Sequence, residues 1–227
     1  NLYSSLFDDY HKHLAVIKAL AEHHYGLSLS KLLAVAHLPV GGSSLSIIRE
    51  LEASGFIMTI PFYKKEKKET AYRLVDEYSL FYLKCVKKNA ASTSRRMSWH
   101  QVVNSASYKS WAGYNFENVV IKHLVCLKKA LGISDLYTHV SYWCNRKAQI
   151  DLLIERADQI IHVCEIKFSA SPLSPTALQK EFNLKCEEFT KETQPRATLL
   201  KTLISLYGVD SKTQITDRSV ILDGLFG

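Results

Sequence analysis

The sequence lacks several features that would assign it to a particular class of protein. No apolar run approaches the roughly 20 residues needed to span a bilayer, and the N-terminus lacks the basic and apolar stretches of a signal peptide. The five cysteines are odd in number and form no Cys-x-x-Cys pair, which argues against a disulfide framework and a zinc ribbon. We therefore expect a soluble cytoplasmic protein with reduced thiols and no membrane partner.

Length and charge indicate what the chain can bind. Its 227 residues, 47% of them hydrophobic, suffice for one large or two small domains with packed cores. A formal net charge of +7 and a pI near 9.1 favour an anionic partner, and nucleic acid is the first candidate. Because the sequence shows no initiator Met, we also expect it to be a piece of a longer protein.

Residues 1–75 show the element order of a winged helix-turn-helix domain. Three short helical patterns precede two strands that flank a lysine-rich hairpin tip. Ser28 is placed to cap the second helix, and Gly55 suits the left-handed position past the end of the third. The expected helices cover residues 14–21, 29–33 and 43–54, and the expected strands cover residues 56–60 and 70–74.

The third helix occupies the position of a recognition helix, and the hairpin tip carries the charge expected of a DNA-contacting wing. The candidate nucleic-acid-binding residues lie on these two elements: Ser43, Ser44, Ser46, Arg49, Lys64, Lys65, Lys67 and Lys68. Two alternatives stay open. Lysines at a hairpin tip are often simply solvated, and Ile47, on the otherwise exposed side of the helix, would suit a protein contact better than a base edge.

We interpret residues 76–98 as a helical linker and residues 99–227 as a second domain. In this domain a strongly amphipathic helix, with Glu117 near its start, precedes three strand-like runs, a further helix and two more strands. The expected helices cover residues 115–130 and 176–190, and the expected strands cover residues 136–143, 148–155, 160–169, 198–205 and 219–222. This order is typical of an α/β domain with a central mixed sheet.

Polar residues interrupt two neighbouring apolar strands of the second domain. Asp151 lies inside one strand, and the next places Glu165 and Lys167 on one face and Ile166 on the other. An unpaired buried carboxylate is costly, so these residues indicate chemistry. Two carboxylates on neighbouring strands can jointly hold Mg²⁺ or Mn²⁺. A lysine beside the metal can orient the attacking water and counter the charge that develops on a phosphate.

The length of the loop between these strands decides whether the carboxylates meet. A loop centred on Asp158 sets Asp151 opposite Glu165, whereas a two-residue turn would set Asp151 opposite Cys164 and split the cluster. We predict the first arrangement or a bulge. Glu117 then approaches from the preceding helix as a third acidic group, either as a metal ligand or through a metal-bound water.

Asp151 followed by Glu165-Ile166-Lys167 resembles the signature of the PD-(D/E)xK nuclease superfamily, and Glu117 matches its helix-borne acidic residue. The resemblance implies a restriction-endonuclease-like fold and metal-dependent hydrolysis of phosphodiester bonds. It also implies that Glu117, Asp151, Glu165 and Lys167 are catalytic and that the three carboxylates bind Mg²⁺ or Mn²⁺.

Nearly the whole chain also resembles the C-terminal region of archaeal-type AAA+ ATPases, through residues 76–82 after the winged helix and residues 110–117. This resemblance implies an N-terminal P-loop domain that binds ATP in the intact protein. The sequence itself has no Gly-x-x-x-x-Gly-Lys-Ser/Thr motif. The partner that this resemblance implies is the ATPase domain. We also expect nucleic acid, with DNA first, as a partner, and a homo-oligomer stays open.

Two other functions stay open beside the nuclease. The polar cluster could be a network that only stabilises the sheet, with Lys167 paired to Glu165 or Asp151. Alternatively, the chain could be a non-catalytic nucleic-acid-binding or protein-docking module that regulates the ATPase. Metal dependence separates these functions, because a structural network predicts no binding of Mg²⁺ or Mn²⁺.

Overall fold

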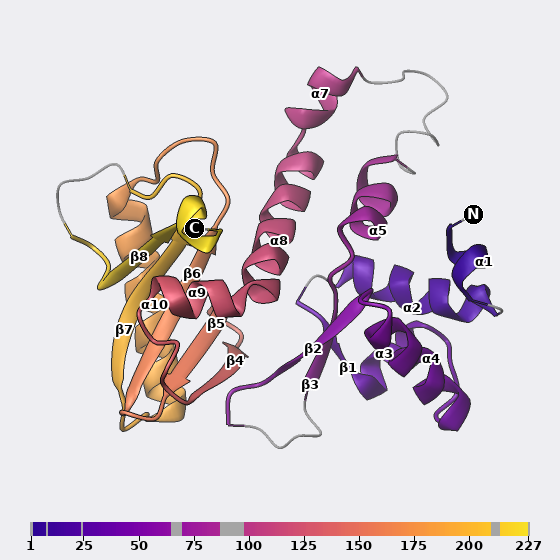
Figure 1. The fold of residues 1–227 in the computed structure, drawn as a ribbon, viewed down its shortest axis with the longest axis horizontal. Coiled ribbons are helices and arrows are strands. Elements are labelled where there is room, and N and C mark those ends of the chain that lie inside the picture. The colour runs from indigo at the N-terminus through magenta and orange to yellow at the C-terminus, as the bar shows by residue number, and fades with distance from the viewer. Residues whose placement is uncertain are drawn as a thin grey trace. The chain divides into compact units, whose positions relative to one another are not determined.

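The computed structural model describes residues 2–7, 9–23, 25–64, 70–86, 98–209 and 214–226 (Figure 1). The chain divides into two compact units. The first comprises Asn1–Pro61 with Lys65–Asn115, and the second comprises Phe62–Lys64 with Phe116–Gly227. The predicted domain boundaries at residues 75 and 98 both lie within the first unit.

The first unit opens with helices that precede a small sheet. Its first elements are α1 (Leu2–Leu6), α2 (Tyr10–Glu22), β1 (Leu27–Ser28), α3 (Leu29–Val35), α4 (Gly42–Ala53), β2 (Ile57–Pro61) and β3 (Thr70–Leu74). The strands form an antiparallel sheet in the order β1-β3-β2, so β1 adds a short third strand to the expected hairpin. Gly55 follows α4 with φ of 73°, the left-handed conformation predicted for it.

Helices α2, α3 and α4 enclose the apolar core of the first unit, in which Ile17, Leu32 and Leu51 are almost completely buried. Ile47 also belongs to this core and is 6% exposed, so the prediction that it lies on the exposed side of its helix is wrong. The reason is the phase of the apolar stripe. The buried positions of α4 begin at Ser44 rather than Leu45, and Ile47 follows Ser44 by three residues.

The helical segment after β3 is more broken than the sequence predicted. Its described elements are α5 (Glu77–Phe81), the π-helix η1 (Tyr82–Val86), α7 (Trp99–Val103), α8 (Ala106–Lys122) and α9 (Leu124–Ala130). Residues 87–97 of the predicted linker lie outside the described residues. The single helix expected over residues 115–130 is two helices that meet at His123. Because α8 begins at Ala106, Glu117 lies in its second half and not near its start.

A five-stranded sheet forms the centre of the second unit. Its elements are β4 (Thr138–Cys144), β5 (Gln149–Arg156), β6 (Ile160–Lys167), α10 (Pro175–Thr193), β7 (Thr198–Ser205), β8 (Arg218–Ile221) and the 3-10 helix η2 (Leu222–Leu225). The strand order is β4-β5-β6-β7-β8, antiparallel from β4 to β6 and parallel from β6 to β8. The predicted α/β class with a central mixed sheet is confirmed.

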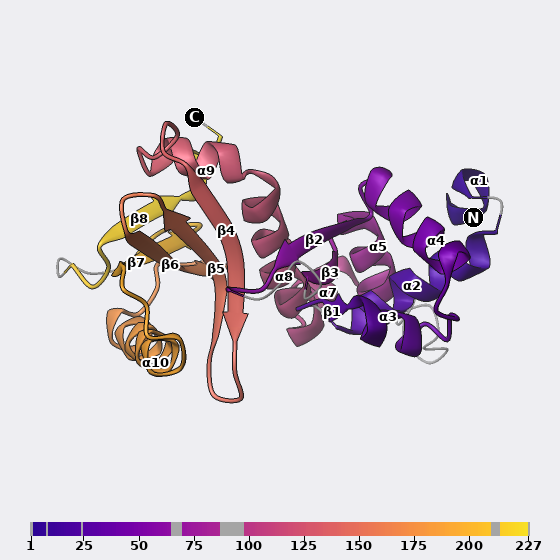
Figure 2. The same ribbon diagram turned by 90° about the horizontal axis from the view of Figure 1, so that it is seen from below.

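Helices cover both faces of this sheet (Figure 2). On one face, Phe116 and Val120 of α8 and Leu127 of α9 pack against alternate residues of the strands, including Leu152 and Ile166. On the other face, α10 contributes three buried residues, Leu178, Phe182 and Phe189. Because β6 is covered on both faces, a polar side chain in it must find its partners inside the unit.

Among the helices of the described ranges, none is long and apolar enough to cross a membrane.

Candidate active site

The register of β5 on β6 decides where Asp151 lies. The two strands pair from Glu155 with Ile161 to Leu152 with Cys164, across a turn centred on Asp158. Continuing this register by one residue sets Asp151 opposite Glu165, so the predicted register is confirmed. The backbone pairing of the two strands ends at Leu152, however. Beyond it, a side chain links the strands, because Asp151 Oδ2 accepts a hydrogen bond from the Ile166 N–H at 3.2 Å.

Glu165 is the most enclosed acidic residue of the site, with 1% of its surface exposed. Lys167 Nζ lies 2.8 Å from Glu165 Oε1, two residues along the same strand. Ile166, between them, packs into the core on the opposite face of the sheet. The alternation predicted for β6 is therefore confirmed, and it brings Glu165 and Lys167 into direct contact.

Helix α10 supplies two site residues that the sequence did not reveal. Lys185 Nζ donates to Glu165 Oε2, and it lies 3.3 Å from Glu181 Oε1, one helical turn earlier. Glu181 Oε1 also accepts from Lys167 Nζ at 2.9 Å. A Glu and a Lys four residues apart are ordinary on a solvated helix face, which hid the pair. The available signal was the phase of Lys185, which falls between Phe182 and Phe189 on the buried face of α10.

Charge within the site shifts the carboxyl pKa values upward. Burial, followed by repulsion from Glu117, raises the pKa of Asp151 to about 6. Burial, followed by repulsion from Asp151, raises the pKa of Glu165 to about 7. Among the causes that act on Lys185, burial is the largest, yet attraction to Glu165 and Asp151 leaves its pKa raised, so its ammonium stays charged. Burial and mutual repulsion thus both favour the protonated forms of these two carboxyl groups.

Glu117 is one of the groups that raise the pKa of Asp151. It is partly buried on α8 and close enough to act electrostatically on Asp151. The predicted catalytic residues Glu117, Asp151, Glu165 and Lys167 thus lie near one another in the second unit, on α8, β5 and β6.

The donor chemistry of this region fits a hard divalent cation. Asp151 and Glu165 supply carboxylate oxygens from adjacent strands, and a bound cation would offset the repulsion that, after burial, raises their pKa values. Within the described ranges, no group of three or more His, Cys, Asp or Glu side chains is arranged to hold a metal ion. Both oxygens of Glu165 already interact with ammonium groups, Oε1 with Lys167 and Oε2 with Lys185.

The predicted nucleic-acid-binding residues of α4 divide by exposure. Ser43, Ser46 and Arg49 are exposed, and Ser46 donates its hydroxyl to Glu50 Oε1 at 2.8 Å. Ser44 is 1% exposed and donates to the Pro39 carbonyl at 2.6 Å, so its hydroxyl is directed into the unit.

Of the four predicted hairpin lysines, only one falls in the described part of the chain. Lys64 is exposed, and its Nζ lies 5.2 Å from the centre of the Tyr63 ring. Lys65, Lys67 and Lys68 lie outside the described residues.

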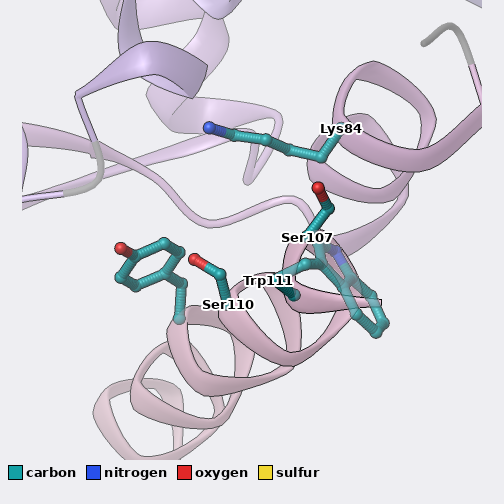
Figure 3. Close-up of a pocket in the computed structure, with 6 residues that line it drawn as sticks. Lys84, Ser107, Ser110 and Trp111 are labelled. Atoms are coloured by element: carbon teal, nitrogen blue, oxygen red, sulfur yellow. The ribbon is translucent and has the colours of Figure 1, made fainter. Parts of the chain in front are cut away.

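A separate hollow of about 280 Å³ lies in the first unit (Figure 3). Lys84 of η1 borders it from one side, and Ser107, Ser110 and Trp111 of α8 border it from the other. The indole Nε1 of Trp111 is buried without a hydrogen-bond partner. This hollow contains none of the acidic residues of the second unit.

Comparison with known proteins gives a family resemblance without a function. Residues 82–183 match the model of the family DUF234, described as archaeal and bacterial proteins of unknown function. The matched segment extends from η1 into α10 and includes Glu117, Asp151, Glu165 and Lys167 but stops before Lys185. Neither the curated proteins nor the solved structures contain a match to the chain.

Proposed function

We propose that the second unit hydrolyses phosphodiester bonds of nucleic acid with the help of Mg²⁺ or Mn²⁺, on a restriction-endonuclease-like fold. The observation that carries this proposal is the convergence of Asp151, Glu165 and Lys167 at adjoining positions of β5 and β6. Perturbed pKa values cluster at functional sites, and the pKa values of Asp151 and Glu165 are both raised.

Each side chain has a part in this reaction. Asp151 and Glu165 would hold the divalent cation, with Glu117 as a third acidic group on the α8 side. The bound cation would supply Lewis-acid stabilisation of the phosphate oxygens. Lys167, whose side chain is one-third exposed, reaches both the enclosed carboxylate and the solvent. Its ammonium would orient the attacking water and stabilise the charge that develops on the phosphate.

We further propose that the first unit is a winged helix that brings the substrate to the second. The exposed Ser43 and Arg49 of α4, together with Lys64, provide donors suited to phosphate oxygens. By its resemblance to AAA+ ATPases, the intact protein would couple this activity to an N-terminal domain that binds ATP.

The alternative is a non-catalytic module that binds nucleic acid or docks a protein and regulates the ATPase. The observation in its favour is the saturation of Glu165 by two lysines, which a purely structural network would also show. Such a module would bind DNA or RNA with a strong dependence on salt and without turnover.

The test is cleavage of labelled single-stranded and double-stranded DNA and RNA in Mg²⁺ or Mn²⁺. We expect the wild-type protein to cut in a metal-dependent manner and Asp151→Asn and Lys167→Ala to lose this activity. Asp151→Asn keeps an oxygen that can accept from the Ile166 N–H, so a loss reports on charge. Glu187→Gln, an exposed acid on α10, is the matched control. Retained cutting in both site variants, or salt-sensitive binding without cutting, would reject the nuclease.

A further inference from the structure

Two lysines divide the oxygens of Glu165 between them. Lys167 contacts Oε1 from the same strand, and Lys185 contacts Oε2 from α10. Glu165 is 1% exposed and Lys185 is 8% exposed, so water competes little for either group. A metal ion that binds the Glu165 carboxylate would therefore compete with two ammonium groups for its oxygens.

Lys185 is the better placed of the two lysines to give way. After burial, which lowers the pKa of Lys185, attraction first to Glu165 and then to Asp151 raises it. The ammonium group therefore interacts with both strand carboxylates. A cation shared by these carboxylates would occupy the same field. Glu181 Oε1, 3.3 Å from Lys185 Nζ, offers an alternative partner one helical turn away. The flexible stem of a lysine allows such an exchange without movement of α10.

We propose that Lys185 is an internal counter-ion, which holds the cation position between Asp151 and Glu165 in the metal-free protein and yields it to a divalent metal. This inference rests on the proposed function in taking Asp151 and Glu165 as carboxylates that bind such a cation. Lys185 then sets the metal concentration that the site requires, and it stabilises the crowded carboxylates when the metal is absent.

The first test measures Mn²⁺ binding by calorimetry or by electron paramagnetic resonance. Lys185→Met removes the charge and keeps the length of the side chain, and we expect it to lower the Kd at least tenfold. Lys180→Met, an exposed lysine on the same helix, is the matched control and should leave the Kd unchanged. Asp151→Asn should weaken binding whether or not Lys185 is present.

The outcomes separate this inference from the proposed function. If the wild-type protein binds Mn²⁺ and Lys185→Met binds it equally well or more weakly, the counter-ion inference is overturned and the proposed metal site stands. If Lys185→Met binds Mn²⁺ and the wild-type protein does not, the counter-ion inference is supported, and the result would explain an inactive wild-type protein. Absence of Mn²⁺ binding from every variant would overturn both.

A measurement on the wild-type chain covers the case in which Lys185→Met fails to fold. Displacement of the Lys185 ammonium should make it more reactive toward an acylating reagent, and mass spectrometry can follow each lysine. We expect acetylation of Lys185 to rise several-fold on addition of Mn²⁺, while acetylation of Lys180 stays constant. An unchanged or slower reaction of Lys185 would overturn the inference.

Discussion

The two units bury ionisable side chains in different surroundings. In the first unit, His13 is 3% exposed, and its Nε2 lies 2.8 Å from Glu50 Oε2. The side chain of Glu50 is 49% exposed and is therefore in contact with water. In the second, Glu165 is enclosed, and its partners Lys167 and Lys185 are also partly or largely buried. The first arrangement pairs one group with one solvated partner, and the second gathers several charges away from water.

The difference teaches how to separate a structural pair from a functional cluster. A structural pair needs only to balance its charges, whereas the second unit combines the carboxylates of Glu117, Asp151, Glu165 and Glu181 with the ammonium groups of Lys167 and Lys185. Its carboxylates outnumber its lysines. Burial of several carboxyl groups close together costs stability, and binding of a cation would recover part of it.

The largest expected effect is on cleavage. Lys167→Met removes the ammonium group next to Glu165, and we expect the rate of metal-dependent cleavage to fall about 10²- to 10³-fold, the range seen when one donor to a developing anion is lost. Glu50→Gln in the first unit should leave the rate unchanged. Comparable losses in both variants, measured at saturating metal, would contradict a functional distinction between the two units.

The next effect concerns His13 and His162, the buried histidines of the described ranges. Both ring nitrogens of His13 face oxygen atoms, whereas His162 Nε2 faces Arg156 Nη1 at 3.4 Å and Nδ1 lies 2.8 Å from Thr202 Oγ1. Burial, followed by the charge of Arg156, lowers the pKa of His162 from 6.5 to about 4.

Because the folded pKa of His162 is depressed, its contribution to stability is present above pH 6.5 and is lost as the pH falls through 4. We expect the loss to be about 2 to 3 kcal/mol. His162→Asn preserves a donor toward Thr202 and removes the titration. Urea unfolding at pH 7 and pH 4 should show a smaller acid loss in the variant, and an equal loss would contradict the assignment.

A third effect has the opposite sign. The folded pKa of Asp151 is raised to about 6 from 3.8, so its contribution to stability is present below pH 3.8 and is lost as the pH rises through 6. Without metal at pH 8, Asp151→Asn should be more stable than the wild-type protein by about 1 to 3 kcal/mol. The advantage should disappear near pH 4 in urea unfolding curves. Destabilisation at pH 8 would indicate a balanced structural network.

The smallest expected effect is in the first unit. Hydrogen bonds from Ser46 and then from His13 lower the pKa of Glu50, so its contribution is present above the ordinary carboxyl range and is lost on acidification. Since Glu50 is solvated, Glu50→Gln should shift the unfolding midpoint only slightly at pH 7. If Glu50→Gln shifted the unfolding midpoint as much as His162→Asn does, the difference between the ionisable groups of the two units would be contradicted.

The strands of the second unit could be predicted because their signal is local. Apolar runs and the alternation around Asp151 and Glu165 fix the strand positions, and the loop centred on Asp158 fixes the register. The helices gave a weaker signal. Helix α8 extends back to Ala106 through a run of Ser, Tyr and Lys that lacks an apolar stripe, so its start could not be found by periodicity.

The site was predictable only where its residues lie on the strands. Glu181 and Lys185 enter through the packing of α10 on the sheet, and sequence spacing does not report which carboxylate a helix residue will reach. The phase of α4 shows the same limit. Ser44 and Leu45 are equally acceptable starts for a buried stripe by spacing, and only tertiary contacts decide that Ser44 and Ile47 face the core.

The turn around Asp158 gives the site an unequal tolerance of mutation. Substitutions in the turn leave the alignment of β5 on β6 intact, but loss or gain of a single residue would bring Asp151 opposite the wrong partner and reverse the faces of one strand. Evolution of this region should therefore accept altered composition more readily than altered spacing. The length of this exposed turn thus determines whether Asp151 and Glu165 lie opposite each other.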